Sequence, residues 1–290
     1  MIKSPLRYPG GKSRAVKKIC EYLPNNFSDY ITEYREPFVG GGALFIYLKQ
    51  QYPHLKIWIN DLNPELYLFW KVARSNLSNL VKEVWYIKNN YKNGKLLFTE
   101  LADADLEKLS ELERAVRFFV LNRITFSGTV ESGGFSQQAF YKRFTPSSVE
   151  RLEKLGHILC DIKITNLDYS YLLSSQNKNT FLFLDPPYYT ATKSRLYGIR
   201  GNLHTGFEHQ RFHDLMKSCN HPWLITYDDC KKIRDKFEFA SIYQWELQYG
   251  MNNYKQNKAA KGKELLILNY KISSNQKNYA SKTTQLNMLL

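Results

Sequence analysis

The sequence predicts an α/β fold in which a mixed, mostly parallel sheet is flanked by helices and interrupted by a mostly helical insert. Three observations predict this fold. A strand, a glycine turn, a helix and a second strand follow one another over residues 31–60. A continuous apolar strand appears at residues 180–184, and helical hydrophobic spacing fills most of residues 75–150. Strands that alternate with helices in this way are typical of parallel sheets built from βαβ units.

The first βαβ unit begins with ITEYREPFV (31–39), which has the branched and aromatic composition of a strand and runs into three glycines at 40–42. The following ALFIYLKQQY is a predicted helix, and KIWIN (56–60) is a predicted second strand. Asn63 then has the character of an N-cap, and Pro64 that of a first helical residue. This order of elements predicts the opening of a doubly wound sheet.

The middle of the chain changes period. From about residue 75 to 150 the apolar residues recur at spacings of three and four, which indicates one buried helix face; the clearest run is Leu109, Leu112, Val116, Phe119 and Val120. The segment TFSGTVESGGFSQ follows, with glycines at 128, 133 and 134 between β-branched and aromatic residues. This composition predicts a β-hairpin or an exposed loop within the insert.

Strands return after the insert. The run TFLFL (180–184) is apolar at every position, as expected of a central parallel strand that is covered on both faces. Four further strands are predicted at 163–166, 223–226, 240–248 and 264–270. The predicted division is therefore a catalytic domain from 1–74 and 151–272, an insert at 75–150, and a polar, flexible tail at 273–290.

The charge of the chain indicates an anionic partner. The 41 Lys and Arg residues exceed the 27 Asp and Glu residues, so the formal net charge is +14. The charge is also segregated, because residues 1–20 contain six basic side chains and no acid, whereas residues 100–113 contain six acids and one lysine. A nucleic acid is the first expectation and an anionic membrane surface the second.

Several classes of protein are excluded. No apolar run approaches the roughly 18 residues that a membrane helix requires. The basic start has no apolar stretch behind it, so no secretory signal is expected. The four cysteines are scattered, which indicates a reducing compartment and hence a cytoplasmic location. His209 and His213 have helical spacing, but Gln210 stands where zinc hydrolases carry a glutamate, so no metal site is predicted.

The glycine turn has the composition of a ligand site. Glycines between a strand and a helix allow a ligand to approach the backbone, and the free N–H groups of the helix start face it. Asp61 lies 21 residues beyond Gly40, at the end of the next predicted strand. An acid at about this distance accepts hydrogen bonds from ribose hydroxyls. The alternative is that Asp61 caps the helix behind it.

The segment YPGGKS at residues 8–13 superficially resembles a phosphate-binding loop. Such a loop requires a glycine at position 6, where this chain has Leu6, and a strand before it. Nucleoside triphosphate hydrolysis through this segment is therefore rejected. Lys12 beside two glycines can still meet an anionic group, such as the carboxylate of an amino-acid-like cofactor, or it is a surface lysine in a turn.

The tetrapeptide Asp185-Pro186-Pro187-Tyr188 directly follows the apolar strand, at the end of the strand where open α/β sheets bind ligands. The Asp185 carboxylate and the carbonyl of Pro186 are acceptors, and Pro186 has no N–H. Tyr188 adds an aromatic face. Two acceptors beside a flat ring suit a planar amine such as the amino group of a base. The alternative is an ordinary proline-rich turn.

Taken together, YPGGK, EPFVGGGALF, Asp61 and LDPPY resemble the Dam-type site-specific DNA adenine methyltransferases, and the order of the motifs agrees over nearly the whole chain. The resemblance implies a Rossmann-like methyltransferase fold and S-adenosylmethionine as cofactor. It implies catalytic roles for Asp185, Pro186 and Tyr188. The cofactor contacts that it implies are Tyr8, Lys12, Phe38, Gly40, Gly42, Asp61, Asp168 and Asp185.

The resemblance also implies a mechanism on double-stranded DNA. The target adenine is flipped out of the duplex and stacked on Tyr188, and its 6-amino group is held by Asp185 and the Pro186 carbonyl. The insert reads the sequence, although it differs from the stretch found in GATC-reading enzymes. The implied DNA contacts are Arg123, Ser127, Thr129 and Ser136 for bases or backbone, and Lys142 and Arg143 for phosphates.

Other functions stay open on the sequence alone. Methylation of the cytosine 4-amino group would use the same chemistry, and a basic DNA-binding protein with an inactive site would have the same charge. The glycine turn also allows a dinucleotide oxidoreductase, but that reading leaves Asp-Pro-Pro-Tyr unexplained. We expect a monomer that acts on duplex DNA without a membrane, with a cognate restriction endonuclease as a further partner.

Overall fold

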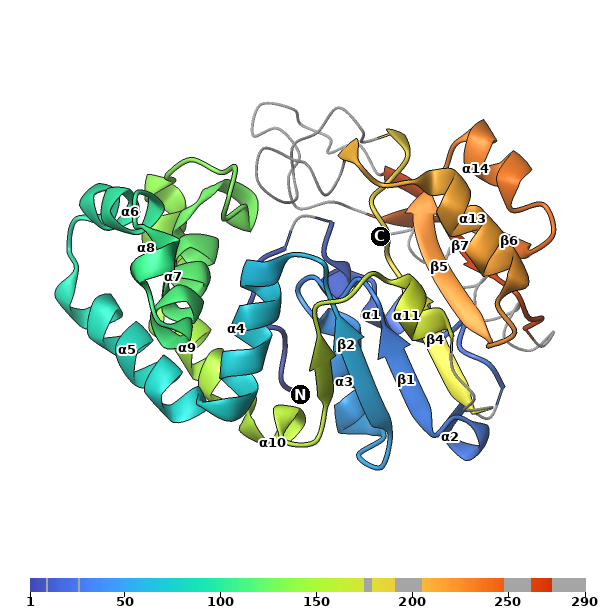
Figure 1. Cartoon of the computed structure of the whole chain (residues 1–290), viewed down its shortest axis with the longest axis horizontal. Helices are drawn as coiled ribbons and strands as arrows, with labels where there is room; N and C mark the ends of the chain where they lie inside the picture. The colour runs from blue at the N-terminus through green and yellow to red at the C-terminus, as the bar shows by residue number, and fades with distance from the viewer. Residues whose placement is uncertain (9, 26, 175–178, 191–204, 248–261, 273–290) are drawn as a thin grey trace, which may run out of the picture.

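The computed structural model describes residues 1–8, 10–25, 27–174, 179–190, 205–247 and 262–272 (Figure 1). The predicted flexible tail at 273–290 lies outside the described residues. No helix in the described ranges has both the length and the apolar character needed to cross a membrane.

The centre of the molecule is a seven-stranded sheet with the order β3-β2-β1-β4-β5-β7-β6. Strands β3, β2, β1, β4 and β5 pair in parallel, whereas β7 runs antiparallel to both β5 and β6. The predicted mixed, mostly parallel sheet is therefore confirmed. The strands are β1 Glu33–Glu36, β2 Lys56–Asn60, β3 Lys163–Thr165, β4 Thr180–Leu184, β5 Trp223–Asp228, β6 Ser241–Leu247 and β7 Gly262–Leu268.

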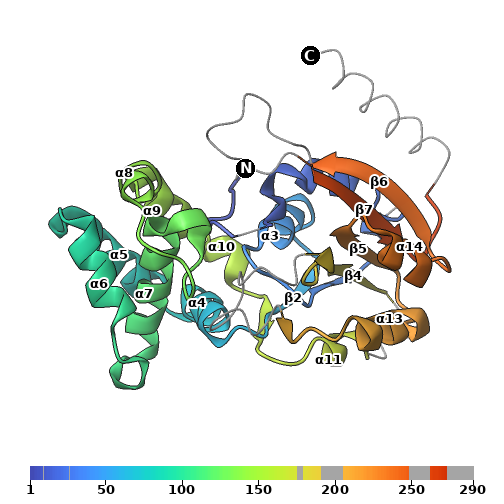
Figure 2. The same cartoon turned by 90° about the horizontal axis from the view of Figure 1, so that it is seen from above.

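Both faces of the sheet are buried. In β4, Phe181 and Phe183 belong to one hydrophobic cluster, and Leu182 and Leu184 belong to another. This alternation follows from the two-residue period of a strand, which sends successive side chains to opposite faces. Helix α3 (Ala43–Gln51) covers one face, and α11 (Ser170–Leu173) and α13 (His209–Ser218) cover the other, as Figure 2 shows. As predicted, the strand is apolar at every position because both of its faces are covered.

The first strand is shorter than predicted, because pairing with β2 ends at Glu36 rather than at residue 39. Pro37 follows, and a proline has no N–H to donate to the neighbouring strand. The start of helix α4 (Pro64–Ser75) agrees with the prediction. The side chain of Asn63 accepts hydrogen bonds from the first free N–H groups of the helix, and Pro64 occupies its first turn.

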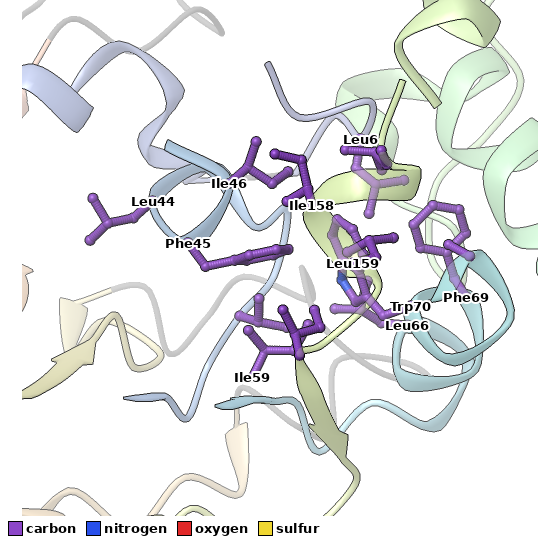
Figure 3. Packing of buried hydrophobic residues seen from close by; sticks show 14 of the residues in the cluster. Leu6, Leu44, Phe45, Ile46, Ile59, Leu66, Phe69, Trp70, Ile158 and Leu159 are labelled. Atoms are coloured by element: carbon purple, nitrogen blue, oxygen red, sulfur yellow. The ribbon is translucent and has the colours of Figure 1, made fainter. Parts of the chain in front are cut away.

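Helix α4 joins the sheet to a group of helices. Figure 3 shows Phe69 and Trp70 of α4 packed among apolar side chains, with Leu159 of helix α10 (Gly156–Leu159) beside them. Helix α7 (Glu111–Ile124) packs on α4 from the other side, so one hydrophobic cluster runs from α3 into α7. The other helices of this group are α5 Leu77–Asn90, α6 Gly94–Ala102, α8 Gln137–Arg143 and α9 Pro146–Glu153.

These helices gather beside the β3–β2 edge of the sheet, on the left of Figure 1. The helical character predicted for residues 75–150 agrees with the structure, whereas their status as a separate recognition domain stays a prediction. The remaining short elements are η1 Lys12–Arg14, α1 Val16–Cys20, α2 Phe27–Tyr30, η2 Leu106–Lys108, η3 Phe126–Gly128 and α14 Lys231–Lys236.

The prediction of a β-hairpin in this region is wrong. Residues 125–136, called here the recognition loop after the role predicted for this region, contain a single antiparallel bridge between Thr125 and Phe135 instead of two paired strands. Ser127 has a φ of 55° and Gly128 a φ of 78°, so the backbone turns in the left-handed region directly after the bridge. A strand cannot extend through such a pair of residues.

Candidate active site

The sheet changes direction between β1 and β4. The chain proceeds from β1 toward β2 and β3 on one side, and from β4 toward β5 on the other. In open α/β sheets, ligands bind in the crevice outside the carboxyl ends of the strands at such a switch point. A cavity of about 720 Å³ lies at this position, and both the glycine turn after β1 and Asp185 after β4 line it.

The glycine turn has the backbone that its sequence predicts. Gly40 has a φ of 47° and Gly42 a φ of 67°, a region in which side chains other than glycine are strained. A Cβ atom at Gly42 would lie 2.3 Å from Cε1 of Phe45. Because Gly42 has no side chain to cap α3, the buried carboxylate of Glu36 accepts the hydrogen bond from the Phe45 N–H at 3.2 Å instead.

Asp61 lies beside this turn, as its spacing predicts. Its carboxylate accepts the N–H of Gly40 at 3.0 Å and the N–H of Asn63 at 3.1 Å. Burial raises the pKa of Asp61 to about 6, against the lowering effect of these backbone hydrogen bonds. Asp61 therefore serves the helix start and also lines the cavity. Asp61 is thus placed where it can cap the helix, and the second alternative, an acceptor for ribose hydroxyls, stays a prediction.

The opposite part of the cavity is aromatic. Phe38 lies 5.3 Å from Tyr169 and 5.8 Å from Phe207, measured between ring centroids. Asp168 accepts two hydrogen bonds from the guanidinium of Arg211, at 2.8 and 3.0 Å, and this pairing lowers the pKa of Asp168 to about 2. Asp168 lines the cavity as expected, and Tyr169, Phe207 and Arg211 are cavity residues that sequence reasoning missed.

Tyr8 and Lys12 bring the amino terminus into the site. The ring of Tyr8 packs on the glycine turn, so a Cβ atom at Gly40 would lie 2.9 Å from Tyr8 Cδ1. Lys12 is only 5% exposed, and its Nζ lies 2.8 Å from Asp185 Oδ1. The prediction gave Lys12 an anionic cofactor group as partner, whereas in the structure it pairs with the carboxylate of the Asp-Pro-Pro-Tyr segment.

Asp185 also accepts a hydrogen bond from the hydroxyl of Thr226 at 2.5 Å. Pro186 is buried. The hydroxyl of Tyr188 donates to Glu264 at 2.9 Å, and its ring stacks on Tyr227 with 5.9 Å between the centroids. The ring of Tyr188 is therefore held from its hydroxyl end and by Tyr227, and Lys12 Nζ lies over the ring, 5.0 Å from its centroid.

Glu264 is a buried acid that sequence reasoning missed. It is 1% exposed and lies at the start of β7, 4.0 Å from Lys12 Nζ. Burial raises the pKa of Glu264 to about 7, although Lys12 lowers it. The one available signal was an acid at the start of an apolar strand, in KELLIL.

The predicted DNA contacts fall into two groups. Ser127 and Arg143 line the mouth of the cavity, Thr129 is half-buried, and Lys142 is exposed. Arg123 and Ser136 are only 4% and 6% exposed, and DNA contact by either stays a prediction.

Both buried residues support the loop. Arg123 donates through Nε to the backbone carbonyl of Arg143 at 2.8 Å and through Nη1 to that of Pro5 at 3.1 Å. Ser136 caps helix α8 by accepting from the N–H of Ala139 at 3.2 Å. Arg123 thus holds the backbone of Arg143, which is itself exposed at the cavity mouth.

The chain resembles known DNA methyltransferases over most of its length. The family model described as D12 class N6 adenine-specific DNA methyltransferase matches residues 8–251. The type II methyltransferase M.MjaIII of Methanocaldococcus jannaschii is 28% identical over 67% of this chain and 71% of its own. The type II methyltransferase M1.LlaDCHI of Lactococcus lactis is 26% identical over 80% and 75%, respectively. The type II methyltransferase M.CviBI of a Paramecium bursaria Chlorella virus is 24% identical over 86% and 91%.

The family match covers the glycine turn, Asp61, the helical group and the Asp-Pro-Pro-Tyr segment. The glycine turn, Asp61, Asp185 and Pro187 line the cavity, whereas Pro186 and Tyr188 are not among its lining residues. It favours the adenine 6-amino group over the cytosine 4-amino group and over an inactive DNA-binding protein. The chain belongs to the family of D12 class N6 adenine-specific DNA methyltransferases, and its reaction is methylation of the 6-amino group of adenine in DNA.

Proposed function

We propose that the chain transfers the methyl group of S-adenosylmethionine to an adenine that is flipped out of duplex DNA. One observation carries this proposal. The Asp185 carboxylate and the left-handed glycine turn line the same cavity, from the two strands between which the sheet changes direction. An acceptor for the amine of a base and a backbone cradle for a nucleoside-containing donor therefore share one cavity.

The cavity has the character that S-adenosylmethionine requires. Its volume of about 720 Å³ is within the usual range of ligand pockets, roughly 300–1,000 Å³. The rings of Phe38 and Tyr169 suit a purine, and the Asp61 carboxylate suits ribose hydroxyls. With a pKa of about 6, Asp61 is mostly ionised at pH 7 and able to accept these hydrogen bonds. The bound donor would supply an electrophilic methyl group on a positively charged sulfur.

Asp185 would act as the acceptor for the 6-amino group. Thr226 donates a hydrogen bond to its carboxylate, and Lys12 pairs with it. An acceptor on each amine hydrogen, the second being the carbonyl of Pro186, draws the nitrogen lone pair out of the ring. The chain itself would contribute mainly position and the exclusion of water. The Asp185 carboxylate would accept the proton that the amine loses when its nitrogen takes the methyl group.

Tyr188 would stack on the extruded base. Its hydroxyl is anchored on Glu264, and one face lies against Tyr227, so the ring is fixed before the base arrives. Unstacking and unpairing an adenine costs a few kcal/mol, and a rigid aromatic surface returns part of that cost on binding. Extrusion of this kind explains how an amine inside a duplex reaches a cavity at the end of a sheet.

The mouth of the cavity suits a phosphate backbone. Arg7, Arg14 and Arg143 line the cavity. Burial, and then the charges of Arg151, Arg7 and Arg143, lower the pKa of Arg123 to about 9. Such concentrated positive charge favours a polyanion. We infer that the helical region at 75–150 reads the DNA sequence and that Ser127, Thr129, Lys142 and Arg143 contribute contacts to it.

We further infer that the chain acts as a monomer beside a cognate restriction endonuclease. The support for the endonuclease is the name type II methyltransferase carried by M.MjaIII and M1.LlaDCHI. The endonuclease is tested by challenging the methylated DNA with extracts of the source cells, since protection should be confined to the methylated sequence. Sedimentation of the protein with and without a site duplex tests the monomer.

The main test is to express the chain in a host without DNA methylation and to map modified bases by single-molecule sequencing. The expected result is N6-methyladenine at one defined sequence, absent from the same host with an empty vector. Calorimetry with S-adenosylmethionine on the purified chain tests the donor separately. Methylated cytosine, or a purified chain that binds no S-adenosylmethionine, would contradict the proposal.

A further inference from the structure

The segment from Ser4 to Tyr8 lies between the glycine turn and the recognition loop. On one side, the hydroxyl of Ser4 donates to the carbonyl of Gly41, and the ring of Tyr8 packs against Gly40. Figure 3 shows Leu6 of this segment among the buried side chains, so this residue anchors the segment in the hydrophobic core. Any group bound at the turn therefore meets Tyr8.

Asn122 ties the other side of this segment to the recognition loop. It is fully buried at the end of α7. Its Oδ1 accepts the N–H of Arg7 at 2.8 Å, and its Nδ2 donates to the carbonyls of Arg7 at 2.6 Å and Gly128 at 2.9 Å. The guanidinium of Arg7 also donates to the carbonyl of Thr125 at 3.1 Å. One side chain thus holds the backbone of both segments.

Gly128 shows how close this contact is. A Cβ atom at Gly128 would lie 2.2 Å from the carbonyl oxygen of Arg7, and its φ of 78° disfavours other residues. Gly134, in the same loop, has open space around its Cβ position. The recognition loop is therefore fitted to the amino-terminal segment at Gly128 and not at Gly134.

A second chain of hydrogen bonds connects the glycine turn to the loop through Asp61 and Asn63. Asp61 accepts the N–H groups of Gly40 and Asn63, and the side chain of Asn63 donates to Glu131 Oε2 at 3.1 Å. Glu131 belongs to the recognition loop. The glycine turn is thus connected to this loop twice, through Tyr8, Arg7 and Asn122 and through Asp61, Asn63 and Glu131.

We propose that Asn122 and Glu131 are positioning residues that couple the recognition loop to the cofactor pocket, so that cofactor and DNA each strengthen the binding of the other. The inference rests on the proposed function, since it requires a ligand at the glycine turn. A ligand there would fix Tyr8 and Asp61, and each of them is connected to the loop through one buried amide side chain, Asn122 or Asn63. Coupling between two sites is reciprocal and typically changes affinity by about 5–150-fold.

The test measures the affinity for a duplex that carries the sequence mapped above, with and without saturating S-adenosylhomocysteine, on the full chain. We expect this compound to strengthen DNA binding by about 10-fold in the wild type, within the usual range of coupling. Gly128→Ala should bring the ratio close to one. Gly134→Ala, the same change in the same loop, should keep the wild-type ratio.

Glu131 supplies a second pair of variants in case Gly128→Ala does not fold. Glu131→Ala removes the acceptor for Asn63 and should reduce the ratio, whereas Glu131→Gln keeps an acceptor oxygen and should restore most of it. Equal weakening of DNA binding with and without the compound would show a purely structural role and overturn the inference. A wild type that binds no S-adenosylhomocysteine would instead defeat the proposed function.

Discussion

The strand-end site and the recognition loop are built in different ways. Asp185 and the glycine turn follow strands whose two faces are buried, so the sheet fixes the distance between them. The recognition loop is held by one bridge and by side-chain hydrogen bonds from Asn122 and Asn63. A sheet packed on both faces opens only when the whole protein unfolds, whereas a loop held by a few side-chain hydrogen bonds opens locally at a small cost in free energy. In the proposed function, the chemistry lies on the rigid part, and contact with the DNA sequence lies on the adjustable part.

The largest expected effect is on the rigid part. Asp185→Asn keeps the shape of the side chain but removes the charge that Lys12 and Thr226 hold, so methyl transfer should fall by about 10²–10³-fold or more. Initial rates with tritiated S-adenosylmethionine measure it. Asp229→Asn is the matched control, since Asp229 directly follows β5 but pairs with Arg234. A similar loss in both variants would remove the special role of Asp185.

The next effect is on stability at the glycine turn. Gly42→Ala places a Cβ atom 2.3 Å from Phe45 and 2.9 Å from Trp70, both fully buried, in a left-handed backbone. We expect a loss of roughly 2–5 kcal/mol in the free energy of unfolding, from the backbone strain and the overpacking together. Urea unfolding measures it. Gly134→Ala in the loop should change it by less than about 0.5 kcal/mol, in the range of surface substitutions. Equal losses would mean that the loop is as rigid as the sheet end.

A third effect depends on pH. Because burial raises the pKa of Glu264 to about 7, the folded protein keeps a proton that the unfolded chain releases near pH 4.5. The stability that this proton contributes is complete below about pH 4.5 and is lost as the pH rises through 7. Relative to Glu264→Gln, the wild type should therefore lose up to about 1.4 kcal/mol per pH unit across this window.

Urea unfolding of both proteins at pH 5, 6, 7 and 8 measures the difference. Glu238→Gln, at an exposed glutamate that follows α14, is the control and should run parallel to the wild type. A constant difference between wild type and Glu264→Gln would show that Glu264 is ionised throughout. It would also show that the rigid part of the site tolerates a buried charge without a penalty.

The smallest effect concerns an exposed ion pair at the cavity rim. Arg211→Ala removes the two hydrogen bonds to Asp168, but both side chains are partly solvated, so the free energy of unfolding should change by only about 0–1 kcal/mol. We expect the KM for S-adenosylmethionine to rise while kcat is kept. Steady-state kinetics separate the two constants. A fall in kcat with an unchanged KM would place Arg211 with the reacting groups instead.

Local features of the site were predictable from the sequence. The apolar run of β4 ends at Asp185, and Asp61 follows its strand at the spacing expected of a ribose acid. In both cases the strand itself carries the residue to the edge where ligands bind. The helix start at Asn63 and Pro64 was equally local, because a cap depends on its next three residues alone.

Features that depend on distant pairing were not predictable. Lys12 and Asp185 are 173 residues apart in the chain, so no sequence window contains both. The resemblance implied DNA contacts for Arg123 and Ser136. In the structure, Arg123 donates to backbone carbonyls of other segments, and Ser136 caps helix α8. Ser136 before QQAFYKR was in fact a readable helix start, and its signal as a cap was overlooked.

The antiparallel direction of β7 has a consequence for protein synthesis. Because β7 runs antiparallel to β5, its first residues, including Glu264, lie beside the carboxyl end of β5. Lys12, from the amino-terminal part of the chain, lies at the same place. The ribosome makes Lys12 first and Glu264 some 250 residues later, at about 5–20 residues per second. For many seconds, a nascent chain therefore has Lys12 and Tyr188 but not Glu264, which contacts both. The site can be completed only after the last described strand has been made.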